Sequence, residues 1–263
     1  MEDQFSRTAL LIGWENVEKL KNRRVAVFGI GGVGGHCAEA LCRSGIGTID
    51  LFDGDVVDIT NINRQLIATF KTIGRDKVDV MRERLLEINP GAKIGARKLF
   101  YLPENADTVD LAVYDYIVDA VDTMAAKLEL VCRATALGVP VISAMGAANK
   151  LDPSAFEVAD IFDTSVCPMA RIMRGELRKR GVKSLKVVYS KEPPAMPNAA
   201  PHPDPQALPM DPSDNAPHPD PQEPPPDPNA NAPRRRQIPA SSAFTPPVAG
   251  LIMAAEVVKQ LLR

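Results

Sequence analysis

The sequence contains few cysteines, and no two of them form a C-x-x-C pair. The four that occur stand singly among 263 residues, at Cys37, Cys42, Cys132 and Cys167. Structural zinc sites usually take their ligands from closely spaced pairs, so we expect no such site here. We expect three of these cysteines in the core, whereas Cys167, in the stretch SVCPMA, is the candidate for an exposed thiol.

A long hydrophobic run is also missing. The longest late apolar stretch, residues 248–262, includes Glu256 and Lys259, and it is shorter than the roughly 20 residues that a membrane span requires. The first residues, MEDQFSRTALL, lack the basic region and apolar run of a secretory signal. We therefore expect no membrane span and a cytoplasmic location.

Neither sign of charge is in large excess. The 31 basic and 33 acidic residues give a formal net charge of −2, which by itself does not indicate nucleic-acid binding. Length and apolar content, in contrast, are ample. A chain of 263 residues that is 45% hydrophobic can form one large α/β domain with a substantial core.

A nucleotide-binding fingerprint stands near the start. The apolar run 25–28 reads as a buried parallel strand, and Gly29-x-Gly31-x-x-Gly34 follows at once, ahead of a helical pattern. Such glycines permit a tight turn and let backbone N–H groups approach phosphate at a helix N-terminus. The fingerprint does not distinguish NAD, FAD, SAM and ATP, and a closely packed strand–helix turn is the structural alternative.

The second predicted strand, residues 48–52, ends at Asp53, about where a carboxylate binds ribose hydroxyls. An NAD site needs one acid here and no arginine, yet a crowded polar loop follows, and a lysine comes soon after it. Cations at these places suit the phosphates of a nucleoside triphosphate, although each taken singly is also compatible with a solvated surface. The polar positions are Asp55, Asp58, Asn61, Asn63, Arg64, Gln65 and Lys77.

A third strand-like run, residues 116–121, leads to Asp122 and Thr123. A carboxylate at the tip of a parallel strand lies where open α/β sheets bind ligands. With a triphosphate present, Asp122 is a candidate for holding Mg²⁺. Capping of the following helix by Asp122 or Thr123 is equally compatible with this pattern. A further buried strand is predicted at residues 139–143.

Taken together, these motifs resemble the adenylyltransferases related to ubiquitin-activating enzymes. The resemblance depends on GIGGVGG, DGDVVDITNINRQ, GRDKV, EINP and DAVDT. FSRTALLIG, SAMGAANKLDP and PASSAFTPPVAGLIMAAEVV are similar to the tRNA threonylcarbamoyladenosine dehydratase family. The resemblance implies a Rossmann-like, mostly parallel sheet with helices on both faces and extra late strands. It also implies a homodimer that uses ATP and Mg²⁺.

The resemblance further implies which residues form the site. In this family the positions of Gly31, Asp53, Asn61, Arg64, Lys77 and Asp122 form the ATP site. The position of Arg7 reaches the nucleotide of the other subunit. Our candidate catalytic residues are therefore Arg64, Lys77, Asp122 and Arg7, with Asp122 as the metal ligand. The candidate cofactor-binding residues are Gly29, Gly31, Gly34, Asp53, Asp55, Asn61, Asn63, Arg64 and Lys77.

The expected reaction is adenylation of the carboxylate of threonylcarbamoyladenosine in tRNA, followed by ring closure with release of AMP and pyrophosphate. The main alternative is adenylation of the C-terminus of a ubiquitin-like sulfur carrier. Many enzymes of that kind resemble one another in having two C-x-x-C pairs, which this chain lacks. A sulfur-transfer partner, an NAD-binding dehydrogenase and a catalytically silent scaffold remain open alternatives.

The later part of the chain changes character twice. From residue 170 to 191 it is strongly basic, and Arg171, Arg174 and Arg178 share one helical face. That face is either a contact for tRNA phosphates or a solvated surface. Residues 193–236 are rich in proline and repeat APHPDPQ, which is typical of a disordered low-complexity insertion. We therefore predict a single domain from 1–192 and 237–263.

Overall fold

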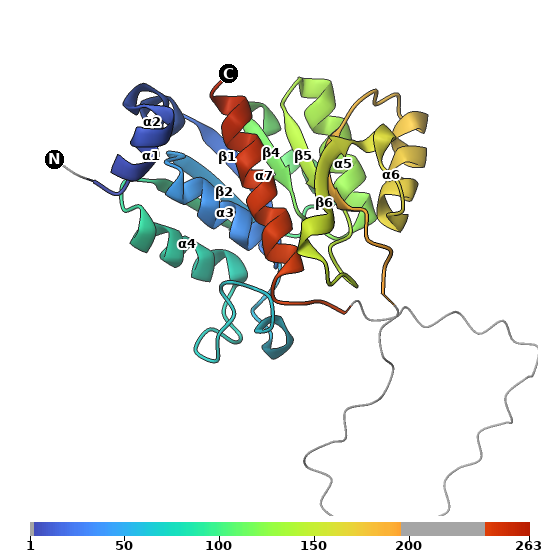
Figure 1. The fold of residues 1–263 in the computed structure, drawn as a ribbon, viewed down its shortest axis with the longest axis horizontal. Coiled ribbons are helices and arrows are strands. Elements are labelled where there is room, and N and C mark those ends of the chain that lie inside the picture. The colour runs from blue at the N-terminus through green and yellow to red at the C-terminus, as the bar shows by residue number, and fades with distance from the viewer. Residues whose placement is uncertain (1–2, 196–239) are drawn as a thin grey trace, which may run out of the picture. The chain divides into compact units, whose positions relative to one another are not determined.

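A computed structural model describes residues 3–195 and 240–263, apart from which nothing is placed (Figure 1). Residues up to Ala195 and from Ser241 onward form one compact unit. The predicted insertion at 193–236 lies almost entirely outside the described residues. Both chain segments of the compact unit contribute to the same set of layers, because the last helix packs on the central sheet.

A seven-stranded sheet forms the centre of this unit, with the order β3-β2-β1-β4-β5-β7-β6. All neighbouring pairs are parallel except β6 and β7, which are antiparallel. The prediction of a mostly parallel sheet with extra late strands is therefore confirmed. The strands are β1 (Arg24–Phe28), β2 (Thr48–Asp53), β3 (Lys93–Lys98), β4 (Tyr116–Asp119), β5 (Val141–Ala144), β6 (Phe156–Asp160) and β7 (Lys186–Ser190).

Helices cover both faces of the sheet (Figure 1). They are α1 (Ser6–Ile12), α2 (Trp14–Lys21), α3 (Gly34–Arg43), α4 (Lys77–Ile88), α5 (Met124–Leu137), α6 (Pro168–Lys179) and α7 (Thr245–Leu261). In the described ranges no helix is long and apolar enough to cross a membrane. The helices α3, α4 and α7 share the larger apolar cluster, whereas α5 and α6 pack with the other clusters.

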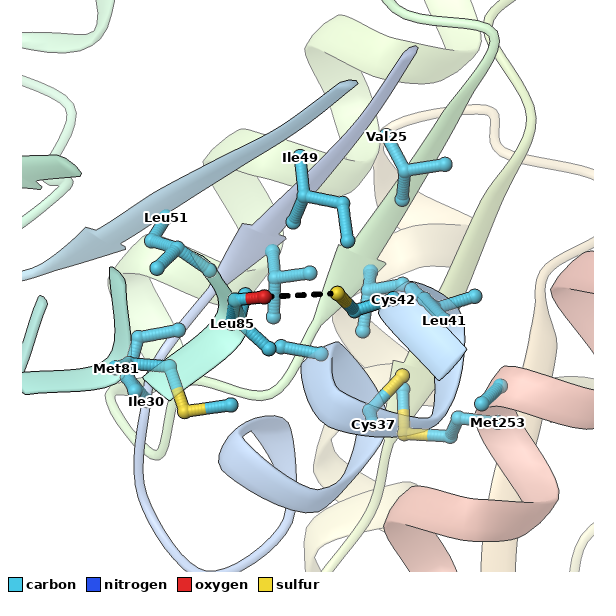
Figure 2. Packing of buried hydrophobic residues seen from close by; sticks show 14 of the residues in the cluster. Val25, Ile30, Cys37, Leu41, Cys42, Ile49, Leu51, Met81, Leu85 and Met253 are labelled. Carbon is cyan, nitrogen blue, oxygen red and sulfur yellow. Dashed lines mark hydrogen bonds between the residues drawn. The ribbon is translucent and has the colours of Figure 1, made fainter. Parts of the chain in front are cut away.

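The larger cluster holds two of the cysteines (Figure 2). Cys37 and Cys42 are fully buried, as predicted, and the Cys42 thiol donates a hydrogen bond to the Leu85 carbonyl at 3.4 Å. Burial raises the pKa of Cys42 to about 11 and also raises the pKa of Cys37. Both thiols therefore stay protonated at neutral pH and act as packing groups.

The prediction for Cys167 is wrong. Its side chain is buried, because Cys167 occupies the N-cap position of α6 and packs into the cluster under that helix. A Cβ atom on Gly146 would lie 3.8 Å from the Cys167 sulfur, so the thiol faces the loop that follows β5. Sequence position suggested a surface loop, but the turn into α6 directs the side chain inward.

Two strand boundaries also differ from the prediction. The run 116–121 ends as a strand at Asp119, because the chain turns from there toward α5. The run predicted at 139–143 begins only at Val141, since the Val139 N–H bonds to the Ala134 carbonyl and completes the end of α5. Both changes move the loops that carry Asp122 and residues 145–150 closer to the ends of their strands.

The first two helices lie at the amino-terminal ends of the strands, away from the loop 54–76 (Figure 1). We predicted an apolar face there from Phe5, Leu10, Leu11 and Trp14. Phe5 is buried within its own chain and packs beside Gly45. Leu10 and Leu11 are 84% and 86% exposed and Trp14 is 48% exposed, so this part of the face has no cover within the chain.

Candidate functional site

The glycine loop connects β1 to α3 and touches the end of β4. Gly29 has a φ of +87°, and a Cβ atom there would lie 2.6 Å from the Ala120 carbonyl oxygen. A Cβ atom on Gly34 would lie 1.8 Å from the Gly29 oxygen. Gly31 has open space, with Gln65 Nε2 at 3.9 Å from its ideal Cβ. The outer glycines therefore permit close backbone packing, whereas Gly31 leaves room in front of the α3 N-terminus.

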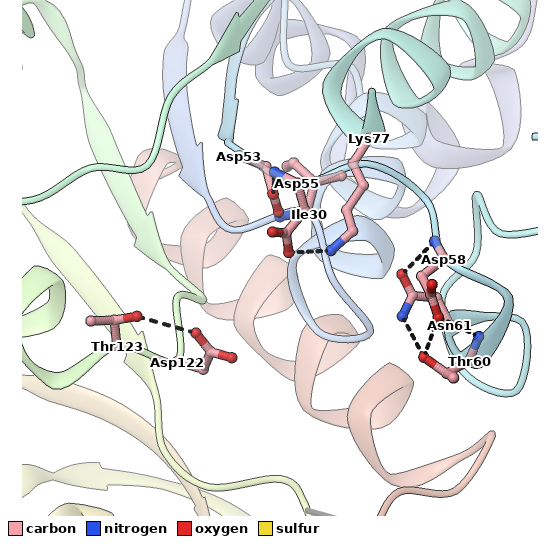
Figure 3. Close-up of polar contacts among 9 residues, drawn as sticks. All are labelled: Ile30, Asp53, Asp55, Asp58, Thr60, Asn61, Lys77, Asp122 and Thr123. Atoms are coloured by element: carbon pink, nitrogen blue, oxygen red, sulfur yellow. Dashed lines mark hydrogen bonds and ion pairs between the residues drawn. The ribbon is translucent and has the colours of Figure 1, made fainter. Parts of the chain in front are cut away.

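Asp53, at the end of β2, fastens the glycine loop to that strand. One carboxylate oxygen accepts a hydrogen bond from the Ile30 N–H at 2.6 Å, and the other accepts one from the Asp55 N–H at 2.8 Å (Figure 3). Burial is the main influence on Asp53 and raises the pKa of its carboxyl, although the two N–H groups and Lys77 oppose the shift. Each oxygen keeps acceptor capacity for a further donor such as a ribose hydroxyl.

Lys77 is held by Asp55 rather than lying free. The Lys77 ammonium lies 2.6 Å from the Asp55 carboxylate, and the Lys77 N–H bonds to the Asp55 carbonyl (Figure 3). The Lys77 side chain is 6% exposed, whereas that of Asp55 is 50% exposed. A buried cation thus faces a partner that stays in contact with water. A phosphate that approached from solvent could replace this carboxylate.

The polar loop after β2 is organised by short-range hydrogen bonds. Asp58 caps the 3₁₀ turn Ile59–Asn61, and Asn61 returns a side-chain bond to the Asp58 N–H. Asn61 is buried, so part of its polarity serves the loop itself. Asn63 donates to the Ser241 carbonyl at 3.1 Å, which connects the loop to the segment before α7.

Arg64 lies over the glycine loop. Its guanidinium donates to the Thr60 carbonyl and to Asn63 Oδ1, at 3.0 and 2.9 Å. A Cβ atom on Gly32 would lie 3.3 Å from Arg64 Cγ, which places the stem of the side chain against the loop. The structure therefore brings Arg64, Asp53 and Lys77 to the same edge of the sheet as the three glycines. This edge is where the strand order reverses between β2 and β4.

Asp122 reaches the same edge from the end of β4 (Figure 3). It is exposed, and the hydrogen bond that its carboxylate accepts is a long one, 3.5 Å from the Thr123 hydroxyl. Thr123 occupies the N-cap position of α5, but no side-chain capping bond is made. The carboxylate is therefore available to a ligand.

The donors at this edge fit Mg²⁺ that arrives with a nucleotide. Among residues 3–195 and 240–263 no group of three or more His, Cys, Asp or Glu side chains is arranged around a common centre. Mg²⁺ usually takes one or two carboxylates together with water and substrate phosphates rather than a cage of protein ligands. A single open carboxylate facing a phosphate-binding loop meets this description.

Sequence reasoning missed a residue beside the glycine loop. Gln65 is 7% exposed, and its Oε1 atom has no hydrogen-bond partner within the part of the chain that the structure describes. Its Nε2 atom lies next to Gly31. A buried amide oxygen without a partner costs free energy, which is usual where a ligand supplies the missing donor. The sequence carried no signal beyond its place in the polar loop.

The structure does not bring Arg7 to this edge. Arg7 is exposed on α1, and α1 and α2 precede β1 and lie at the opposite end of the strands (Figure 1). Within one chain it therefore cannot serve the nucleotide that the glycine loop binds. Its assignment stays a prediction about a second copy of the chain.

The three arginines of α6 have different surroundings. Arg171 is exposed, whereas Arg174 is partly buried and donates to both the carbonyl and the hydroxyl of Thr164. The Arg178 guanidinium lies 5.1 Å from the centre of the Phe162 ring. Arg171 and Arg174 also line a cavity of about 250 Å³ with residues 166–168. The common face predicted from spacing therefore contains one free cation and two that also stabilise their own subdomain.

The sequence as a whole matches known proteins that are built around such a site. It matches the ThiF family over residues 5–263. A curated tRNA threonylcarbamoyladenosine dehydratase of Bacillus subtilis is 42% identical over 264 residues, which covers 100% of this chain and 96% of that protein. A probable adenylyltransferase/sulfurtransferase, MoeZ of Mycobacterium tuberculosis, is 35% identical over 142 residues, or 53% of this chain and 36% of MoeZ.

Solved structures give the same result. Two structures of the Escherichia coli tRNA N6-threonylcarbamoyladenosine dehydratase TcdA, in complex with AMP and with ATP, superpose with TM-scores of 0.80 and 0.77. Each is 26% identical and covers 98% of this chain, and this chain covers 94% and 93% of theirs. The resemblance inferred from the motifs is thus confirmed. The chain belongs to the ThiF family and, within it, to the tRNA threonylcarbamoyladenosine dehydratases.

Proposed function

We propose that this protein is an ATP-dependent dehydratase that acts on threonylcarbamoyladenosine in tRNA. The observation that carries the proposal is the convergence of the glycine loop, Asp53, Arg64, Lys77 and Asp122 at one edge of the sheet. The full-length similarity to proteins of that name supplies the substrate. The domain is formed by 1–192 and 237–263, with 193–236 inserted into it.

The reaction begins when the carboxylate of the modified nucleoside attacks the α-phosphate of ATP. Pyrophosphate leaves and an acyl-adenylate forms. A nitrogen of the same side chain then attacks the activated carbonyl and closes a ring, and AMP departs. The net change in the nucleoside is the loss of one water. No covalent enzyme intermediate is needed, which agrees with the burial of Cys37, Cys42 and Cys167.

The residues at this edge divide the work between them. Asp53 accepts hydrogen bonds from the ribose hydroxyls, and the glycine loop places N–H groups of the α3 N-terminus against phosphate. Arg64 and Lys77 stabilise the charge that develops on the phosphates, with Lys77 exchanging Asp55 for a phosphate oxygen. Asp55, Asn61 and Asn63 hold these cations and the loop in place.

Asp122 would hold Mg²⁺, which supplies charge neutralisation at the phosphates when it is bound. Arg171 contacts a tRNA phosphate, with Arg174 and Arg178 beside it on α6. The protein acts as a homodimer in which Arg7 of one subunit reaches the nucleotide of the other, and α1 exposes Leu10 and Leu11 next to it. The cytoplasm is the proposed compartment, because tRNA is the substrate.

Adenylation of a ubiquitin-like sulfur carrier is the second candidate. The similarity to MoeZ, which covers about half of this chain, favours it. A protein partner for sulfur transfer would then be required in addition to ATP. The absence of C-x-x-C pairs in the sequence weighs against this candidate, as does the coverage of the whole chain by the dehydratase relative.

The test is a reconstituted reaction. Purified protein is incubated with ATP and with tRNA that carries threonylcarbamoyladenosine, or with a ubiquitin-like sulfur carrier instead. Nucleosides from the digested tRNA are analysed by mass spectrometry, and ATP–pyrophosphate exchange is followed in both mixtures. We expect loss of one water from the modified nucleoside and exchange that depends on tRNA. Exchange that depends on the carrier alone, with unchanged nucleosides, would establish the second candidate instead.

A further inference from the structure

A charged pair lies fully buried directly behind Asp122. Lys127 of α5 and Asp119 at the end of β4 are both 0% exposed, and the Lys127 ammonium lies 2.9 Å from the Asp119 carboxylate. Ser143 of β5 donates to the same carboxylate oxygen and accepts a hydrogen bond from Lys127 at 3.2 Å. Two strands and one helix therefore meet in a polar cluster inside an otherwise apolar layer.

Stability alone does not account for this cluster. Removing two charges from water costs several kcal/mol per ion, and apolar residues of similar size are often as stabilising as a buried ion pair. Asp119 and Lys127 have apolar neighbours such as Val118 and Leu128 on the same elements, so an apolar solution was sterically accessible. The pair therefore calls for an explanation in terms of the geometry that it imposes.

Lys127 holds both ends of the turn that carries Asp122. Its side chain binds Asp119, the residue before the turn, and its backbone N–H bonds to the carbonyl of Thr123, the residue after it, at 3.0 Å. The second oxygen of Asp119 accepts a hydrogen bond from the Val121 N–H at 3.3 Å, inside the turn. The middle of the turn is limited from the other side, where Ala120 abuts Gly29.

We infer that Asp119 and Lys127 are positioning residues that fix the Asp122 carboxylate for a divalent metal ion bound with the nucleotide. The inference rests on the proposed function, since it specifies how the metal carboxylate of that site is held. The Asp122 side chain itself has little to restrain it, with one long hydrogen bond from Thr123. Its position is therefore set by the backbone, and the buried pair sets the backbone. Partners behind a metal ligand commonly change metal affinity by about 10–100-fold.

The test compares two double variants. Asp119→Asn with Lys127→Met removes both buried charges and keeps the side-chain sizes, so no unpaired charge remains in the core. The matched control, Arg24→Met with Asp50→Asn, removes an ion pair of 2.8 Å at the amino-terminal ends of the same central strands. Asp122→Asn provides the reference for loss of the ligand itself. Thermal melting of each protein gives its stability.

Two readouts report on the turn without using catalysis. Mn²⁺ binding is measured by electron paramagnetic resonance in the presence of a non-hydrolysable ATP analogue, and analogue binding is also measured without metal. Hydrogen exchange is measured at the amides of Val121 and Asp122. For Asp119→Asn with Lys127→Met we expect the Mn²⁺ dissociation constant to rise about tenfold or more. We also expect faster exchange in the turn and unchanged affinity for the metal-free analogue, with none of these changes in the control.

Each result decides between the hypotheses. Wild-type Mn²⁺ affinity and wild-type exchange in the turn would overturn the inference, even if Asp122→Asn loses the metal. Equal loss in the control variant would also overturn it, because a general loss of stability would then be the cause. If Asp122→Asn binds Mn²⁺ like the wild type, the metal assignment of the proposed function fails. In that case the inference fails as well for the metal, and unchanged exchange would refute the positioning of the turn too.

Discussion

Replacing Lys77 with methionine separates its role in the reaction from its role in the fold. Lys77 is 6% exposed, and its partner Asp55 is 50% exposed. Methionine keeps most of the stem volume and leaves Asp55 in contact with water. Because one partner of the lost pair is half-exposed, the change in the free energy of unfolding should stay within about 1 kcal/mol. Loss of a cation that meets developing charge should cost about 2.7–4 kcal/mol in the transition state, or about 10²–10³-fold in turnover.

Asp55→Asn is the matched variant, and the structure predicts the opposite balance. It leaves the buried Lys77 ammonium without its carboxylate, which is the costly way to break such a pair. We expect a larger decrease in melting temperature than for Lys77→Met, together with a smaller loss of activity. A non-hydrolysable ATP analogue should raise the melting temperature of Asp55→Asn more than that of the wild type, because phosphate then replaces the missing carboxylate.

The assays are tRNA-dependent ATP–pyrophosphate exchange and thermal melting with and without the analogue. The reasoning would be refuted if Lys77→Met were the less stable of the two variants. It would also be refuted if Lys77→Met kept near-normal exchange. Either outcome would show that the pair belongs to the fold and that Lys77 does not move to the phosphates.

Three further predictions follow from the same structure. Mixing Arg7→Ala chains with Lys77→Met chains should restore activity at about a quarter of the sites, as measured by exchange, since one site of each mixed dimer keeps both groups; no recovery would exclude action across a dimer. Burial raises the pKa of Asp53, so its contribution to stability is present at acid pH and is lost as the pH rises through that value. The melting temperature of the wild type relative to Asp53→Asn should therefore decrease from acid to neutral pH, and an increase would contradict the assigned shift. Arg171→Ala should weaken tRNA binding and reduce its salt slope by about one unit without changing the melting temperature, whereas Arg174→Ala should lower the melting temperature because it loses both bonds to Thr164; equal effects of the two variants on melting would count against this division.

The parts of the site that depend on local sequence could be predicted. The glycine spacing requires a strand before it and a helix after it, and the structure has β1 and α3 there. Asp53 was placed at a strand end and Lys77 at the start of a helix for the same reason, since each boundary is set by neighbouring residues. Only the exact ends moved, as with the strand that stops at Asp119.

Contacts between distant residues could not be predicted. Lys77 and Asp55 are separated by 22 positions, so their pairing depends on how the loop 54–76 folds back on α4. Helical spacing put Arg174 on a face with Arg171 but could not show that Thr164 lies within reach of its guanidinium. Lys127 gave a detectable signal, a charge within the apolar series of α5, but its partner Asp119 comes from another element.

The strand order was also outside the reach of periodicity. The last strand in sequence, β7, pairs with β5 and pushes the earlier β6 to the edge, where it runs antiparallel. Sequence patterns indicate which segments are strands, but not which of two late strands joins the parallel sheet first. That choice depends on the packing of α6 and α7 on opposite faces.

The contacts of Gly29 with Ala120 and of Gly34 with Gly29 have a mechanical consequence. Backbone atoms touch backbone atoms there, so the glycine loop and the turn that carries Asp122 form a single rigid piece. If the site closes around a nucleotide, neither of these parts can supply the movement. The loop 54–76 must move instead, since Arg64 lies on it and its hydrogen bonds to the rest of the molecule are few and exposed, such as that from Asn63 to Ser241. The gap between the phosphate-binding and metal-binding groups is therefore a fixed length, and the loop sets only how tightly the nucleotide is enclosed.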